Sequence, residues 1–211
     1  MSRKHDVREP KRPLLVLTSN AVETCYFLQM RRDCRYGNMS VSQKSDSSEN
    51  LHAVIREAGK LRRDFNFASV WCIVNPVDVH IEADKESEYR QLAKTKKVSV
   101  VYNSPGIETW LYLHFEKPET DRMSRKNLAD KLAEKIPGFR LEEEYFHTGE
   151  GKKLYLRLFP NKSQAVLHAD LMRKEQDFVF PGSDPERLSV QMPAFLAGVI
   201  DGCGRCFISQ G

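Results

Sequence analysis

LLVLTSNAVETCYFLQMR, residues 14–31, decides the fold class. It begins with a short apolar run, Leu14 to Thr18, and continues with apolar residues at helical spacing over Ala21 to Arg31. This order predicts a strand followed at once by a helix. VWCIV, residues 70–74, is a second apolar run, typical of a central strand that helices cover on both faces.

The same alternation continues along the chain. Residues 51–65 have the apolar spacing of an amphipathic helix, 82–97 suit an exposed helix, and 98–102 are β-branched and strand-like. Strands that alternate with helices in this way favour a parallel sheet with right-handed crossovers. We therefore expect an α/β fold with a mostly parallel sheet covered by helices, and a C-terminal α+β extension.

The later residues predict that extension. Residues 107–115 and 126–136 are expected to be helical, the alternation in 154–159 indicates a strand, and helical spacing resumes over 163–173. The expected organisation is a basic flexible N-terminus (1–12), an α/β core (13–115) and an extension packed on that core (116–211).

Composition excludes several classes of protein. The 211 residues are 40% apolar and 29% charged, which argues against a disordered, collagen-like or coiled-coil chain, and the longest apolar runs are too short to cross a membrane. The absence of a secretory signal pattern predicts a cytoplasmic protein with no membrane partner. Five scattered cysteines favour reduced thiols. A net charge of +4 permits an anionic partner without requiring one.

A ligand is expected at the carboxyl ends of the strands, in the loops after Thr18 and Val74, because open parallel sheets bind ligands there. Three stretches carry a more specific signal. They are LLVLTSNAVETCYF (14–27), VWCIVNPVDVH (70–80) and NSPGIETWLYLHF (103–115). Together they resemble the RloB family over about residues 13–175, and the third stretch is the most specific of the three.

The resemblance implies a Toprim-like fold and a role in prokaryotic anti-phage defence by abortive infection, acting on or sensing nucleic acid. In Toprim enzymes, a Glu after the first strand and a D-x-D pair after a later strand hold Mg²⁺ for phosphoryl transfer. Cations held by carboxylates can stabilise the charge that develops on phosphate oxygens. The resemblance therefore raises the possibility of a Mg²⁺-dependent endonuclease.

The sequence departs from the family at the acidic positions. Thr18 and Asn20 stand at the two leading Glu positions, and Asn75 and Val77 stand at the D-x-D positions. Neutral side chains supply no negative charge for Mg²⁺, and valine supplies no ligand. We therefore expect a degenerate metal site.

Three remaining acids could rescue the site as metal ligands or catalytic proton acceptors: Glu23, Asp78 and Glu108. Each also has a structural interpretation. Glu23 and Glu108 lie where first-turn acids stabilise a helix dipole, and Asp78 follows Pro76 where Asp commonly shapes a turn. His114, in an apolar helix, is interpreted as a structural hydrogen-bonding residue in preference to a proton carrier.

Basic residues cluster at Arg31, Arg32 and Arg35, which are candidates for nucleic-acid contact. Two other clusters are Arg3 to Arg12 and Lys60 to Arg63. The alternative interpretation is that all of these charges lie on solvated termini and helix faces.

Three alternatives stay open. The chain could be a non-enzymatic subunit that contacts a partner protein of a defence or restriction complex. The tail PAFLAGVIDGCGRCFIS (193–209) is similar to the LAGLIDADG helix of homing endonucleases, which predicts a symmetric helix interface. The C-x-x-C pair Cys203 and Cys206 could hold Zn²⁺ if His168 or Cys34 came close.

Overall fold

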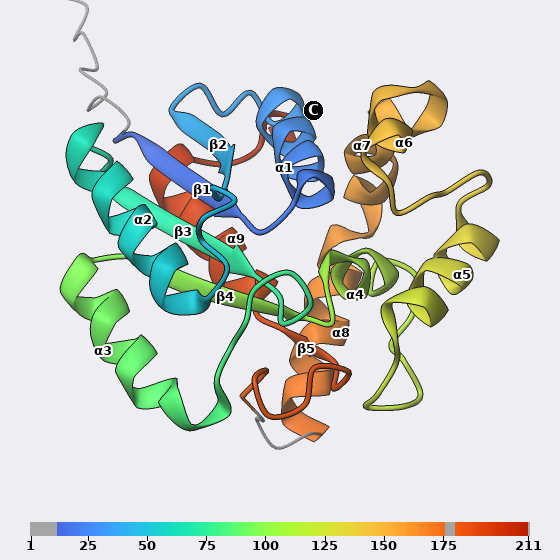
Figure 1. Ribbon diagram of the computed structural model, residues 1–211. Helices are drawn as coiled ribbons and strands as arrows, with labels where there is room; N and C mark the ends of the chain where they lie inside the picture. The colour runs from blue at the N-terminus through green and yellow to red at the C-terminus, as the bar shows by residue number, and fades with distance from the viewer. Residues whose placement is uncertain (1–11, 176–179, 211) are drawn as a thin grey trace, which may run out of the picture.

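The computed structural model describes residues 12–175 and 180–210, so most of the predicted basic N-terminus (1–12) lies outside the described residues. Five strands form one sheet in the order β2-β1-β3-β4-β5 (Figure 1). The strands are β1 (Leu14–Thr18), β2 (Met39–Gln43), β3 (Ser69–Val74), β4 (Ser99–Ser104) and β5 (Ser189–Val190). The first four are parallel, and β5 pairs antiparallel with β4. The predicted mostly parallel α/β fold is confirmed, with β3 in the centre.

Nine α-helices surround the sheet in the described residues. The first four are α1 (Ala21–Asp33), α2 (Leu51–Asp64), α3 (Glu86–Lys96) and α4 (Ile107–Tyr112). The others are α5 (Arg125–Lys135), α6 (Glu143–His147), α7 (Leu154–Leu158), α8 (Lys162–Glu175) and α9 (Met192–Cys203). None of these helices has the length and apolar character needed to cross a bilayer.

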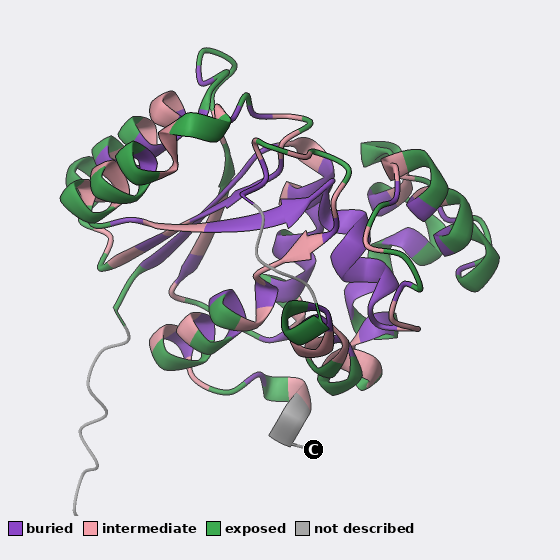
Figure 2. Cartoon of the chain, turned by 90° about the horizontal axis from the view of Figure 1, so that it is seen from below, coloured by how far each residue is buried: buried purple, intermediate pink, exposed green. Residues whose placement is uncertain are grey.

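The two faces of the sheet bury separate apolar clusters because side chains alternate along a strand. Leu15 and Leu17 of β1 face α2 and α3, whereas Leu14 and Val16 face α1, α4, α8 and α9. Figure 2 shows that the buried residues concentrate in the sheet and in the helix segments next to it. The cluster that contains Leu14 and Val16 includes residues from both sides of position 115, so the C-terminal extension shares its core with the sheet.

Residues 154–159 contradict the predicted strand. They form α7 and the start of a 3₁₀ turn, with Leu154, Tyr155 and Leu158 buried and Leu156 exposed. Burial at i, i+1 and i+4 marks one side of a helix, so the alternation of leucines was misleading. Strand β2 was not predicted because its sequence, MSVSQ, is mostly polar and only Met39 is fully buried.

The prediction of reduced thiols is wrong for two cysteines, because Cys34 and Cys206 form a disulfide. These residues are 172 positions apart, so no local spacing in the sequence indicated the pair. The bond also contradicts a Zn²⁺ site on the C-x-x-C pair, since Cys206 no longer offers a thiolate. The predicted cytoplasmic location is not tested by these observations and stays a prediction.

Helix α9 carries the segment similar to LAGLIDADG, and it packs on the chain's own sheet (Figure 1). Phe195, Val199 and Cys203 are fully buried there. The apolar face that a symmetric helix interface would need is already used, so the LAGLIDADG interpretation is not supported.

Gly198 gives a test of this packing. A Cβ placed on it would lie 2.1 Å from the Trp71 ring, whereas a Cβ on Gly37 would meet nothing within 4 Å. Gly198→Ala is expected to lower the free energy of unfolding by about 1–2 kcal/mol, because overpacking outweighs the gain in helix propensity. Gly37→Ala should change it by less than about 0.5 kcal/mol. Denaturant unfolding measures both, and equal stability of the two variants would contradict the packing of α9.

Candidate functional site

The candidate site lies at the carboxyl ends of β1, β3 and β4, where the loops that follow these strands meet. Glu23 lies in the first turn of α1, which follows β1 closely. Asp78 lies in the loop after β3, and Glu108 is the second residue of α4, which follows β4. Side-chain hydrogen bonds and ion pairs link all three carboxylates into one network. The sequence therefore identified three acids that the fold brings together.

Glu23 is held at the start of α1 and is fully buried. Asn20 caps the helix by accepting a hydrogen bond from the Glu23 N–H at 2.9 Å, and the Glu23 carboxylate accepts one from the Ser19 N–H at 2.8 Å. The Asn20 oxygen satisfies the N–H of Glu23, which a helix start leaves without an intrahelical partner, and the Glu23 carboxyl group holds the amide of the residue before the cap. Glu23 thus takes part in the hydrogen bonding at the start of α1 beside its place in the site.

Asn75 links Glu23 to Asp78. Its Oδ1 accepts hydrogen bonds from the Val77 and Asp78 N–H groups, which shapes the turn after β3 and fixes the orientation of the amide. Its Nδ2 then donates to Glu23 Oε1 and to Asp78 Oδ2, both at 2.9 Å. A position where the family carries an acid is here occupied by a donor that bridges two acids.

Arg125, the first residue of α5, links Asp78 to Glu108. Its Nε donates to Glu108 Oε1 at 2.9 Å, and its Nη1 lies 3.4 Å from Asp78 Oδ2. Glu108 is fully buried, while the side chains of Arg125 and Asp78 are 25% and 26% exposed. The guanidinium therefore supplies one positive charge between two acids at the mouth of the site.

Glu108 lies against the backbone of Gly106. A Cβ on Gly106 would come within 2.6 Å of both Glu108 carboxylate oxygens, so only glycine leaves room for this carboxylate. Glu108 Oε2 is buried and receives no hydrogen bond from another described residue. One carboxylate oxygen of the site is therefore left without a donor from a neighbour.

Burial controls the protonation of the two inner acids. Burial raises the pKa of Glu23 from 4.5 to about 8, although the hydrogen bonds from Ser19 and Asn75 act to lower it. Burial also raises the pKa of Glu108, and the Arg125 charge only partly opposes this. Desolvation disfavours the charged form of a carboxyl group, so Glu23 is largely protonated at neutral pH.

The arrangement does not fit Mg²⁺ as it stands. Both oxygens of Glu23 and one oxygen each of Asp78 and Glu108 accept hydrogen bonds from protein donors. The oxygens of the three acids also do not form a group that lies entirely within 4.8 Å. Mg²⁺ is octahedral, keeps several waters and is usually held by one or two carboxylate oxygens that are free to coordinate it. The Asn75 amide bridges Glu23 and Asp78, and the Arg125 guanidinium bridges Asp78 and Glu108, so protein donors already link the three acids.

The other family positions do not add ligands. The Thr18 hydroxyl lies 2.6 Å from the Thr24 hydroxyl and donates to the Ser42 carbonyl, and the Val77 side chain is half exposed. Asn20 Nδ2 donates to Asp78 Oδ2 at 2.5 Å. Asn20 thus joins Asn75 as a second amide donor to the same acid.

The predicted nucleic-acid residues lie apart from this site, near the far end of α1. Arg31 is two turns beyond Glu23, about 12 Å along the helix axis. Arg32 is paired with Asp33, and the Arg35 guanidinium lies 3.7 Å from the centre of the Phe207 ring. The three arginines are exposed, and their contact with nucleic acid stays a prediction.

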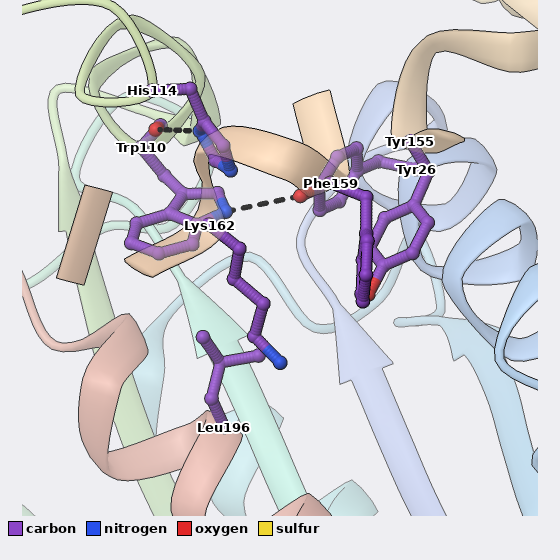
Figure 3. Close-up of a pocket in the computed structure, with 7 residues that line it drawn as sticks. All are labelled: Tyr26, Trp110, His114, Tyr155, Phe159, Lys162 and Leu196. Atoms are coloured by element: carbon purple, nitrogen blue, oxygen red, sulfur yellow. Dashed lines mark hydrogen bonds between the residues drawn. The ribbon is translucent and has the colours of Figure 1, made fainter. Parts of the chain in front are cut away.

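His114 lies at a small cavity between α1, α4 and α8, together with Tyr26 and Lys162 (Figure 3). Its Nδ1–H donates to the Trp110 carbonyl at 3.0 Å. Burial lowers the pKa of His114 to about 4, so the ring is neutral at neutral pH. These contacts agree with the structural interpretation of this residue.

The sequence model of the RloB-like protein family matches residues 14–181. The chain belongs to the RloB-like family. The match contains every part of the site, from Ser19 to Arg125. No curated protein and no solved structure matches the chain.

Sequence reasoning missed Arg125 in this RloB-like chain. It lies 17 residues after Glu108 and 47 after Asp78, so no local motif links it to either acid. The N-cap Ser124 is a weak sequence signal that a helix starts at Arg125, but it does not indicate what the Arg125 side chain contacts. From the sequence, Asn20 and Asn75 were interpreted only as neutral residues at positions where the resemblance predicts acids. Their role as hydrogen-bond donors is seen only in the structure.

Proposed function

We propose that this RloB-like protein acts in anti-phage defence by binding nucleic acid, without cutting it in a Mg²⁺-dependent reaction. Family membership supports the defence setting through the resemblance described above. The observation that carries the absence of cleavage is the position of Arg125 and Asn75 among the three acids. The Arg125 guanidinium and the Asn75 side-chain amide hold these acids together, the role that a metal ion would otherwise have.

Phosphodiester cleavage would require Glu23, Asp78 and Glu108 to act as metal ligands or proton acceptors. Both oxygens of Glu23 accept hydrogen bonds from Ser19 and Asn75, and Glu108 is paired with Arg125. Asp78 is the only one of the three acids that is partly exposed, and its Oδ2 already accepts hydrogen bonds from Asn20 and Asn75. These features favour recognition over cleavage, with the site serving as a rigid support for the loops around it.

Binding is assigned to the exposed arginines at the end of α1. Arg31 is the best single test because Arg32 is already paired with Asp33. Neutralisation of a phosphate releases counterions, so the logarithm of the affinity should fall with the logarithm of salt by about 0.9 for each phosphate contact. Arg31→Ala should make that slope less steep by about 1. Arg173→Ala, on the exposed surface of α8, is the matched control and should leave it unchanged.

The test combines cleavage and binding assays on single- and double-stranded DNA and RNA. We expect no cleavage with Mg²⁺ or Mn²⁺, no difference between the wild type and Glu108→Gln, and salt-dependent binding that survives chelation of divalent ions. Cleavage that Glu108→Gln abolishes would overturn the proposal. Absence of all nucleic-acid binding, with co-purification of a partner protein, would assign the chain to the alternative role of an interaction subunit.

A further inference from the structure

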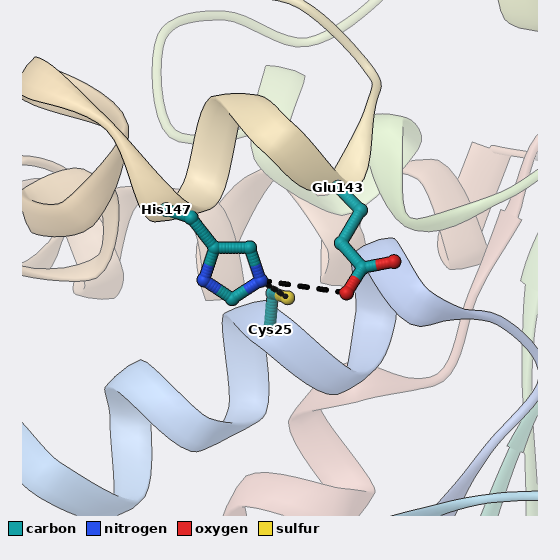
Figure 4. A group of neighbouring side chains, drawn as sticks. All are labelled: Cys25, Glu143 and His147. Atoms are coloured by element: carbon teal, nitrogen blue, oxygen red, sulfur yellow. Dashed lines mark hydrogen bonds and ion pairs between the residues drawn. The ribbon is translucent and has the colours of Figure 1, made fainter.

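A second group of metal-ligating side chains lies on the outer side of α1, away from the carboxylate site. Cys25 on α1 is buried, and Glu143 and His147 are exposed one turn apart on α6. Figure 4 shows the His147 ring and the Glu143 carboxylate pointing down from α6 toward the Cys25 sulfur. Their ligand atoms all lie within 4.8 Å of one another, and this is the group of three found in the described part of the chain.

The distances agree with one shared metal ion. Cys25 Sγ lies 3.6 Å from His147 Nε2, and the same nitrogen lies 3.4 Å from Glu143 Oε1. With Zn–S near 2.3 Å and Zn–N and Zn–O near 2.1 Å, a tetrahedron has S···N and N···O edges of about 3.6 and 3.4 Å. Both separations match these edges, and the Cys25 sulfur and a Glu143 carboxylate oxygen lie within 4.8 Å of each other.

The geometry does not fit a cysteine nucleophile activated by a His–Glu pair. In such a triad, one ring nitrogen faces the nucleophile and the other is held by the acid. Here the thiol and the carboxylate both approach Nε2. A sulfur, a nitrogen and an oxygen that lie within 4.8 Å of one another favour a cation shared by the three.

We propose that Cys25, Glu143 and His147 bind one Zn²⁺ ion, with water as the fourth ligand. Thiolate, imidazole and carboxylate are the three ligand types that proteins use for zinc. The thiol proton leaves to solvent when the Zn–S bond forms, and the exposed side of the group gives the ion and its water access. Nothing in this site depends on the carboxylate network around Arg125.

The three ligands come from two helices, Cys25 from α1 and the other two from α6. The ion therefore cross-links α6 to α1 and stabilises the folded state.

The test uses two titrations of the full chain under reducing conditions. Calorimetry monitors the binding of Zn²⁺, and the thiolate charge-transfer absorption monitors the binding of Co²⁺. We expect one ion per chain, the thiolate band with Co²⁺, and a rise in melting temperature with Zn²⁺. The His147 side chain is exposed, so the His147→Ala variant should fold. It and Cys25→Ser should each weaken Zn²⁺ binding by at least about 100-fold, since even outer partners of metal ligands contribute 10- to 100-fold.

Two controls separate this site from other sources of binding. His52→Ala removes a partly exposed His–Glu pair that has no cysteine, with His52 Nε2 3.5 Å from Glu88, and it should leave Zn²⁺ affinity unchanged. Cys206→Ser removes one of the two thiols that reduction of the Cys34–Cys206 disulfide would release, and it should keep the Co²⁺ thiolate band. Loss of the band in Cys206→Ser but not in Cys25→Ser, or no binding by the wild type, would overturn the proposal.

Discussion

Arg125→Ala is expected to lower the free energy of unfolding by about 2–3 kcal/mol at neutral pH. Removal of one partner of a fully buried ion pair costs about 3–5 kcal/mol, and the 25% exposure of Arg125 reduces that figure. The loss comes mainly from Glu108, which is fully buried and would keep no cation beside it. Denaturant unfolding of the wild type and the variant measures the effect.

A second substitution assigns the loss to the pair. In Glu108→Gln the buried charge is absent, so adding Arg125→Ala to that variant should cost less than it costs in the wild type. Arg173→Ala removes an exposed arginine that lies 3.2 Å from Asp170 and should cost less than about 1 kcal/mol. An Arg125→Ala variant as stable as Arg173→Ala would contradict the role given to Arg125.

The stability of the wild type is expected to fall by about 2 kcal/mol between pH 6.5 and 8 because of Glu23. In the folded protein Glu23 keeps its proton up to about pH 8, whereas in the unfolded chain it ionises above 4.5. Unfolding therefore releases a proton in this window, and a rise in pH favours unfolding. Glu108, whose pKa is also raised, acts in the same direction.

The titration of His114 limits the pH range in which the effect of Glu23 on stability can be measured. Its folded-state pKa is lowered from 6.5 to about 4, so its contribution to stability is present above pH 6.5 and is lost as the pH falls toward 4. Below pH 6.5 the His114 and Glu23 effects have opposite signs. The decline should therefore be clearest above pH 6.5.

Glu23→Gln is the variant that isolates this effect. It should be less stable overall, because its amide places a donor against Ser19 or Asn75, but the fall in stability from pH 6.5 to 8 should be smaller than in the wild type. Glu134→Gln, on the exposed side of α5, should keep the full pH dependence. A wild-type stability that rises with pH in this window would show that Glu23 is ionised in the folded protein.

The parts of the fold that the sequence predicted are those with continuous apolar patterns. Leu14 to Thr18 and Val70 to Val74 are strands because their residues are buried on both faces of the sheet. The missed strand Met39–Gln43 lies at the edge and contacts the core with few apolar side chains. The disulfide between Cys34 and Cys206 depends on a long-range approach that local spacing does not encode.

The candidate site shows the same division. Glu23 and Asp78 follow strands that end at the same edge of a parallel sheet, and Glu108 follows the next strand, so topology alone predicts that the three approach one another. The position of Arg125 could not be predicted in this way. Arg125 reaches the acids from a helix that follows a long irregular segment, and only the folded chain shows that it lies between Asp78 and Glu108.

The central claim is that Arg125 and Asn75 take the place of a divalent cation among Glu23, Asp78 and Glu108. Anomalous diffraction from crystals of the full chain soaked in Mn²⁺ tests it most directly. The account predicts no manganese peak within bonding distance of these three carboxylates and an Arg125 side chain that still contacts Glu108. One or two well-occupied Mn²⁺ ions held by these acids, with Arg125 displaced, would contradict it.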